Sequence, residues 1–205
     1  MLIERPPGWF RLLFPGVLFR MPESNSFPGT VFITFDDGPI PEATPWILDV
    51  LDRFGIKATF FMVGQNVERF PHLLEKVKIK GHKVANHTLH HIRGFRINPS
   101  EYRKDVEDCE KYFNTRLLRP PHGWLTPGQL KEMKKDYRIV MYDLITRDYS
   151  KNVTDREIVN NVKRYTRDGS IIVFHESLKS IEKLKTALPE SLEWLCSRGY
   201  KFGVI

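Results

Sequence analysis

The sequence predicts a parallel α/β domain whose strands close, or nearly close, into a barrel. Strand-like and helix-like stretches alternate about seven times with short links, the pattern of a parallel sheet flanked by helices. The run 58–63 is apolar throughout, which is typical of a strand buried on both faces. Polar residues with chemical potential follow the predicted strands, and a parallel barrel brings such positions to one rim.

In the first half of the chain, apolar runs define the elements and glycines end them. Strands are expected at 31–33, 58–63 and 83–86. Thr44-Pro45 is expected to supply the N-cap and first residue of a helix that Gly55 ends, and a second helix is expected from Asn66 to Lys80.

In the second half, prolines and capping residues mark the boundaries. Helices are expected to open at Pro99, at Pro127 and at the capping box of Thr154 and Glu157. A last helical region, 178–198, is expected to break in two at Pro189. The remaining strands are expected at 117–118, 138–144, 170–174 and 201–205.

Composition limits the class of protein. A chain of 205 residues with 41% hydrophobic content can form one domain with a sizeable core, which excludes a disordered protein. Its net charge of +7 could suit nucleic acid, an anionic envelope polymer or a membrane surface. The basic residues are scattered along helix-like stretches, however, and no stacking motif accompanies them. We therefore expect a solvated basic face and no nucleic-acid partner.

The N-terminal residues 1–29 are expected to form an arm packed on a domain of residues 30–205, with a partner or membrane contact as the alternative. Arg11, Pro15 and Arg20 interrupt the apolar stretch before it reaches the ~18 residues of a membrane span, so no transmembrane segment is expected. No signal peptide is visible. The compartment stays open, cytoplasmic or cell envelope if a signal has been removed. Cys109 and Cys196 are expected to be buried free thiols.

Two adjacent carboxylates, Asp36 and Asp37, follow the first strand and precede Gly38-Pro39. Neighbouring side chains of a strand point to opposite sides, so the two acids act together only if the chain bends at Gly38. A division of labour between a metal ligand and a base is the economical interpretation. Ordinary turn chemistry is the alternative.

Two histidines four residues apart, His87 and His91, would share one face if their segment were helical, whereas His90 would point elsewhere. With Asp37 they could hold one metal ion and leave positions for water and substrate, as a catalytic zinc site does. Arg119 follows another strand, and Asp36 is its natural partner because an unpaired buried guanidinium is costly. A surface arginine before the Pro-Pro turn is the alternative.

His175 ends an apolar run and is either a core histidine or a catalytic one. Asp148 could hold His175 in one tautomer and favour its protonated form; equally, Asp148 could cap the turn before Ser150.

Taken together, these stretches resemble the NodB-type polysaccharide deacetylases of carbohydrate esterase family 4 over roughly residues 30–205. The resemblance rests on five ordered motifs: Thr34-Phe35-Asp36-Asp37-Gly38-Pro39, His87-Thr88-x-x-His91, Arg119-Pro120-Pro121-His122-Gly123, Asp148-Tyr149 and Val173-Phe174-His175. It implies the family's distorted (β/α)7 barrel, of the NodB and glycoside hydrolase/deacetylase type.

The resemblance also implies a role for each matched residue. Asp36 would be the general base, oriented by Arg119, and Asp37, His87 and His91 the metal ligands. His175 would be the general acid, tuned by Asp148. The backbone amide of His122 would help to hold the oxyanion, although His122 stands where the family usually has Tyr. Tyr149 and Val173 replace the family's Trp and Leu at the acetyl pocket, which concerns substrate fit more than chemistry.

The function that follows is metal-dependent hydrolysis of N-acetyl groups on an acetylated glycan or oligosaccharide, releasing acetate and a free amino sugar. The cofactor expected is one divalent ion, zinc, with cobalt or nickel as alternatives. The rivals are hydrolysis of another linear or cyclic amide, an O-acetyl glycan esterase, and a sugar-binding domain without catalysis. The sequence does not identify the acetylated substrate or the oligomeric state of the protein.

Overall fold

A computed structural model describes residues 4–23 and 28–205. The strands within these residues are β1 (Thr30–Asp36), β2 (Thr59–Met62), β3 (Lys83–Asn86), β4 (Leu117–Leu118), β5 (Arg138–Ile139), β6 (Leu144–Ile145), β7 (Ile171–His175) and β8 (Lys201–Gly203). The helices are α1 (Gly8–Leu12), α2 (Thr44–Arg53), α3 (Gly64–Arg69), α4 (Pro71–Ile79), α5 (Pro99–Cys109), α6 (Pro127–Met133), α7 (Asp155–Tyr165) and α8 (Ile181–Ser197). Two short 3₁₀ turns are η1 (Gly94–Arg96) and η2 (Pro121–Gly123).

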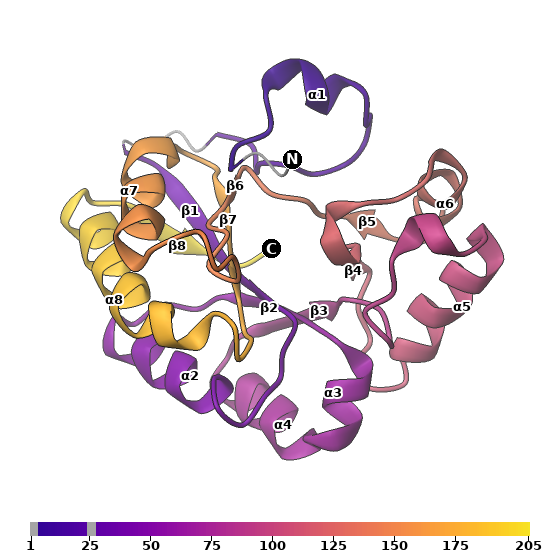
Figure 1. The fold of residues 1–205 in the computed structure, drawn as a ribbon, viewed down its shortest axis with the longest axis horizontal. Helices are drawn as coiled ribbons and strands as arrows, with labels where there is room; N and C mark the ends of the chain where they lie inside the picture. The colour runs from indigo at the N-terminus through magenta and orange to yellow at the C-terminus, as the bar shows by residue number, and fades with distance from the viewer. Residues whose placement is uncertain (1–3, 24–27) are drawn as a thin grey trace.

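The strands form one parallel sheet in the order β5-β4-β3-β2-β1-β7-β6, with β8 beside the first half of β1. The sheet curls, and helices surround its outer face (Figure 1). The predicted parallel α/β barrel is confirmed. Among the described residues, no helix combines the length and apolar character needed to cross a bilayer.

The two sides of the sheet have different cores because side chains alternate along each strand. Phe35 of β1 stacks between Phe60 and Phe174 of the neighbouring strands, with ring centroids 5.0 and 5.9 Å away, in the cluster that packs under the helices. Phe32 and Phe61 belong to a separate cluster together with Val140. Every second residue of β1 therefore faces the barrel interior, and Asp36 is the last of these inward-facing residues.

The barrel is open between β5 and β6, and the N-terminal arm lies against this opening (Figure 1). The N–H of Leu18 donates to Ile139 O at 2.9 Å, and Met141 N donates to Leu18 O at 2.7 Å. On the other side, Met21 N donates to Gly169 O at 2.9 Å. The arm thus pairs with the chain on both sides of the gap.

Some boundaries differ from the expectations. The helix expected over 66–80 is two helices, divided at Phe70, because the residue before a proline is disfavoured in helical conformation. The strand expected over 138–144 is split into β5 and β6, between which the chain leaves the sheet at the opening. The break expected at Pro189 was wrong: α8 is continuous there, and it buries residues on both sides of the proline, including Leu188 and Leu192.

Capping and thiol predictions had mixed outcomes. The capping box of Thr154 and Glu157 is confirmed. Thr44 is not an N-cap but the first residue of α2; its hydroxyl accepts a hydrogen bond from Ile40 N and contacts the Glu176 carboxyl instead. Cys109 is a buried free thiol as predicted, whereas Cys196 is exposed.

Candidate active site

The chemically active side chains gather at the carboxyl-terminal rim of the barrel, around a pocket of about 580 Å³. Asp36 and His175 are direct partners in the register of β1 and β7, so the proposed base and acid stand on adjacent strands. Of the candidate site residues, eight line this pocket: Asp36, Asp37, His87, His91, Arg119, His122, Tyr149 and His175. His90, which would point elsewhere in a helix, lines it as well. Asp148 and Val173 are buried behind the lining.

Asp37, His87 and His91 form a compact set of ligand atoms. Asp37 Oδ1 lies 3.5 Å from His87 Nε2 and 3.1 Å from His91 Nε2, and one ligand atom from each residue lies within 4.8 Å of the others. The segment of the histidine pair is not helical, so the two rings do not meet by sharing a helix face. Thr88 and His91 have positive φ values of 66° and 53°, so a loop with two left-handed residues turns both rings toward Asp37.

The bend that lets both aspartates serve one pocket lies at Asp37 itself, with φ 79°, and not only at Gly38. Asn66 Nδ2 donates to Asp37 O at 2.8 Å and fixes this backbone. A Cβ at Gly38 would lie 1.8 Å from Glu176 Oε2. Glycine at this position therefore lets the Glu176 carboxyl lie against the backbone of the turn.

The hydrogen bonds of these residues fit a metal site. His87 Nδ1 lies 2.7 Å from Arg119 O, and since a carbonyl only accepts, Nδ1 carries the proton and Nε2 keeps its lone pair. Burial acts to raise the pKa of Asp37, but the adjacent imidazoles of His87 and His91 outweigh it and hold that pKa well below its usual range. Two imidazole nitrogens and a carboxylate are a donor set that suits a catalytic zinc ion.

Asp36 is held by the buried Arg119. The guanidinium Nη1 donates to Asp36 Oδ1 at 2.5 Å and to Thr34 Oγ1 at 2.9 Å, while Nη2 donates to Met141 O at 3.1 Å. The guanidinium also lies 3.9 Å from the ring centroid of Phe61. Asp36 Oδ2 makes no hydrogen bond within the described chain, so one oxygen is fixed and the other remains to accept a proton.

His175 is paired with the buried Asp148. Its Nδ1 donates to Asp148 Oδ1 at 2.7 Å, and its backbone N–H donates to Oδ2 at 2.7 Å. Burial acts to lower the pKa of His175, but the charge and hydrogen bond of Asp148 outweigh it and raise the pKa to about 9. This leaves Nε2 of a protonated imidazole available at neutral pH.

Three residues were expected at the oxyanion and acetyl positions. His122 and Tyr149 line the pocket, and Val173 does not. The His122 ring packs 4.7 Å from the His91 ring, centroid to centroid. Among the described residues, the backbone N–H of His122 donates to no backbone carbonyl. Burial, with the charges of His91 and Arg93, lowers the pKa of His122 to about 4. Tyr149 meets His175 edge to face at 4.6 Å. Val173 does not line the pocket; Ile145, its partner on β6, does.

Sequence reasoning missed Glu176 and Tyr142, which also line the pocket. Glu176 is buried with one carboxyl oxygen lacking a hydrogen-bond partner, and burial raises its pKa to about 8. An acid directly after His175 was the available signal. Tyr142 had no local signal, because it lies in the link between β5 and β6 and follows no strand of the predicted pattern.

Comparison with known proteins decides the family. A family model described as polysaccharide deacetylase matches residues 24–140. The chain belongs to the polysaccharide deacetylase family. The predicted family, its barrel fold and the classification as a deacetylase are thereby confirmed.

Among curated relatives, two peptidoglycan-N-acetylglucosamine deacetylases of Bacillus cereus are 34% and 33% identical. Each alignment covers 84% of this chain, with 65% of the first relative and 84% of the second. A chitooligosaccharide deacetylase of Bradyrhizobium is 34% identical over 72% of this chain and 70% of its own length.

A solved structure of a peptidoglycan N-acetylglucosamine deacetylase, in complex with 4-naphthalen-1-yl-N-oxidanyl-benzamide, matches with a TM-score of 0.87 and 31% identity. It covers 98% of this chain and 95% of its own. The structural similarity therefore extends into the N-terminal arm, most of which precedes residue 24, where the family model begins to match.

Proposed function

We propose that this protein hydrolyses the acetamide bond of an N-acetylated glycan and uses one divalent metal ion, zinc in the first place. The observation that carries the proposal is the placement of the Asp37, His87 and His91 ligand atoms beside two fixed acid–base pairs, Asp36 with Arg119 and His175 with Asp148. The relatives named for peptidoglycan and chitooligosaccharide deacetylation support the substrate class. In this proposal residues 30–205 are the catalytic domain and residues 1–29 its arm.

Asp37, His87 and His91 would hold the metal. Bound there, a divalent cation supplies Lewis-acid polarisation of the acetamide carbonyl and acidifies water. The unprotonated Nε2 of His87 and the ionised Asp37 are the states that such binding requires.

Asp36 acts as the general base. Arg119 orients its carboxylate, and the free Oδ2 takes a proton from the attacking water as a C–O bond forms at the acetyl carbon. The unpaired N–H of His122 stabilises the negative charge that develops on the carbonyl oxygen.

His175 acts as the general acid. Its Nδ1–H is bound to Asp148, so Nε2 delivers a proton to the sugar nitrogen as the C–N bond breaks. Acetate and the free amine leave. Tyr149, against the His175 ring, bounds the space for the acetyl group.

The test follows acetate and new amine together on a panel of acetylated sugars, with chelated enzyme and with enzyme resupplied with zinc, cobalt or nickel. Equal release of acetate and amine, lost on chelation and restored by metal, is expected. Acetate without amine would identify an O-acetyl esterase, and turnover only of small cyclic amides would identify the other rival. Activity that survives complete metal removal would contradict the proposal.

A further inference from the structure

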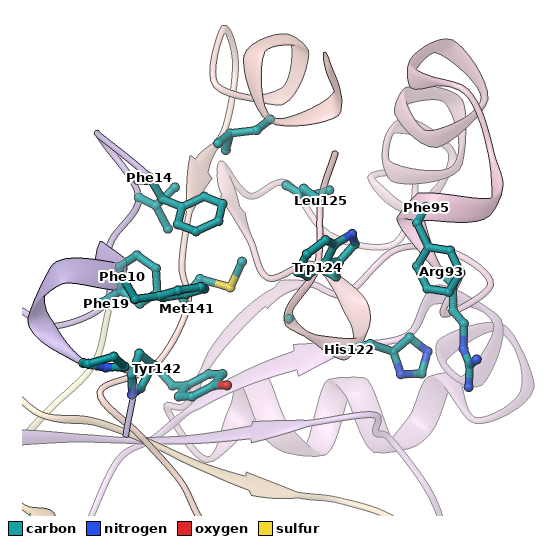
Figure 2. Close-up of a pocket in the computed structure, with 15 residues that line it drawn as sticks. Phe10, Phe14, Phe19, Arg93, Phe95, His122, Trp124, Leu125, Met141 and Tyr142 are labelled. Atoms are coloured by element: carbon teal, nitrogen blue, oxygen red, sulfur yellow. The ribbon is translucent and has the colours of Figure 1, made fainter. Parts of the chain in front are cut away.

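A groove of about 620 Å³ adjoins the catalytic pocket. His122, Gly123, Met141 and Tyr142 line both spaces. Figure 2 shows the groove between the N-terminal arm and the loop after β4. Its volume is within the range of pockets that hold small organic molecules.

The groove is lined almost entirely by hydrocarbon. Phe10, Phe14 and Phe19 come from the arm, and Phe95, Trp124 and Leu125 come from the opposite wall (Figure 2). A sugar unit needs polar partners for its hydroxyl groups, because burying them unpaired is costly. This lining offers few such partners, so its surface suits an apolar chain better than a further sugar.

Exposed apolar side chains are concentrated on the same segments. Trp9, Leu12 and Leu13 of the arm are 66%, 82% and 63% exposed, and Phe95 and Trp124 on the opposite wall are 56% and 51% exposed. Exposed apolar residues gathered on neighbouring segments mark contact with an apolar surface. Of these residues, Phe95 and Trp124 line the groove itself, so its exposed wall is apolar.

One cation stands where the groove meets the catalytic pocket. Arg93 lines the groove beside His122 (Figure 2), and its charge contributes to the lowered pKa of that histidine. Arg93 is exposed and has no salt bridge among the residues that the structure describes. A guanidinium in this position suits a phosphate between a sugar and a hydrocarbon chain.

We propose that the substrate is an acetamido sugar carried on a lipid through a phosphate, with the sugar in the catalytic pocket, the phosphate at Arg93 and the hydrocarbon chain in the groove. This proposal rests on the deacetylase function above and names the substrate class for that site.

The test compares dodecyl and methyl esters of N-acetylglucosaminyl phosphate, below the micelle concentration, on the metal-supplemented enzyme. The dodecyl ester is expected to have a kcat/KM at least about tenfold higher, since each buried methylene adds to binding. Equal values for the two esters would overturn this proposal but leave the deacetylase function intact. Deacetylation of neither ester, nor of any sugar in the panel above, would be the failure of the deacetylase function.

Variants locate the effect. Phe95→Ser and Trp124→Ser are expected to lower the dodecyl-to-methyl ratio several-fold. Ile79→Ser, at a residue 83% exposed on α4 and outside both pockets, is the matched control and should keep the ratio of the native enzyme. Arg93→Gln is expected to reduce the preference for dodecyl phosphate over neutral dodecyl glycoside. An unchanged ratio in both groove variants, or a tetrasaccharide turned over faster than the dodecyl ester, would contradict the proposal.

Discussion

The barrel contains two aspartate–arginine clusters, one at the carboxyl end of a strand and one at the amino end of another. The first opens onto the catalytic pocket, and the aspartate of the second is fully buried. Asp36, at the end of β1, is held by Arg119 and keeps one oxygen without a hydrogen bond at the catalytic pocket. Asp143, just before β6, is fully buried; Arg167 Nε and Nη2 donate to it at 3.0 and 2.8 Å, Ser170 Oγ at 2.7 Å, and Arg11 of the arm is also bound.

An aspartate–arginine pair therefore orients a catalytic carboxylate in one cluster and stabilises the fold in the other. Burial acts to raise the pKa of Asp143, but hydrogen bonds from Arg167, Ser170 and Arg11 outweigh it and lower the pKa to about 2. With both oxygens occupied, Asp143 has no capacity left for a substrate proton. In a parallel barrel, chemistry collects at the carboxyl ends of strands and stability at the amino ends, and this pair of clusters shows why.

Asp36→Asn is expected to give the largest effect. Loss of the general base should lower kcat by ~10²- to 10⁴-fold per folded molecule. The measurement is acetate release, normalised to the folded fraction from circular dichroism. Near-normal kcat would remove Asp36 from the mechanism and with it the contrast between the two clusters.

Asp143→Asn should change stability and spare chemistry. Removing one partner of a fully buried ion pair costs ~3–5 kcal/mol; Arg167 is 37% exposed here, so a loss of about 2 kcal/mol in the free energy of unfolding is expected. Urea denaturation measures it, and kcat per folded molecule should stay unchanged. A catalytic loss as large as that of Asp36→Asn would refute the division between the clusters.

Asp148→Asn should move the alkaline limit of activity. The native His175, with its pKa raised to about 9, should donate a proton up to that pH and lose rate above it. Without the negative charge, the pKa should fall toward the ordinary value near 6.5, and the decline of kcat should begin nearer to neutral pH. The pH profile of kcat measures the shift. A profile identical to that of the native enzyme would mean that Asp148 only supports the turn.

Glu176→Gln should have the smallest effect, on the pH dependence of stability. The folded pKa of about 8 lies above the ordinary value of 4.5, so the native state binds the proton more tightly than the unfolded state. Its contribution is complete below about pH 4.5 and is lost as pH rises through about 8. The variant should flatten this part of the curve of unfolding free energy against pH. An equally steep curve would show that another group is responsible.

Local patterns predicted the strands and the acids and imidazoles that follow them, because a buried parallel strand has a recognisable run and a fixed direction. They could not predict how the segment from His87 to His91 turns, since Thr88 and His91 adopt left-handed conformations that residues other than glycine rarely adopt. Thr44 was expected to cap a helix, yet its hydroxyl donates a hydrogen bond to Glu176, which lies 132 residues further along the chain. The groove joins Phe10 to Trp124, and no local pattern links two segments so far apart.

The arm's pairing at the open side of the barrel has a practical consequence for how this protein is produced. A fragment that starts at residue 24, where the family match begins, would lack Leu18 and Arg11. The backbone groups of Ile139 and Met141 would lose their partners, and Asp143 would lose two cations, Arg5 and Arg11. Bare strand edges recruit other chains, so such a trimmed protein should aggregate where the full chain stays dispersed.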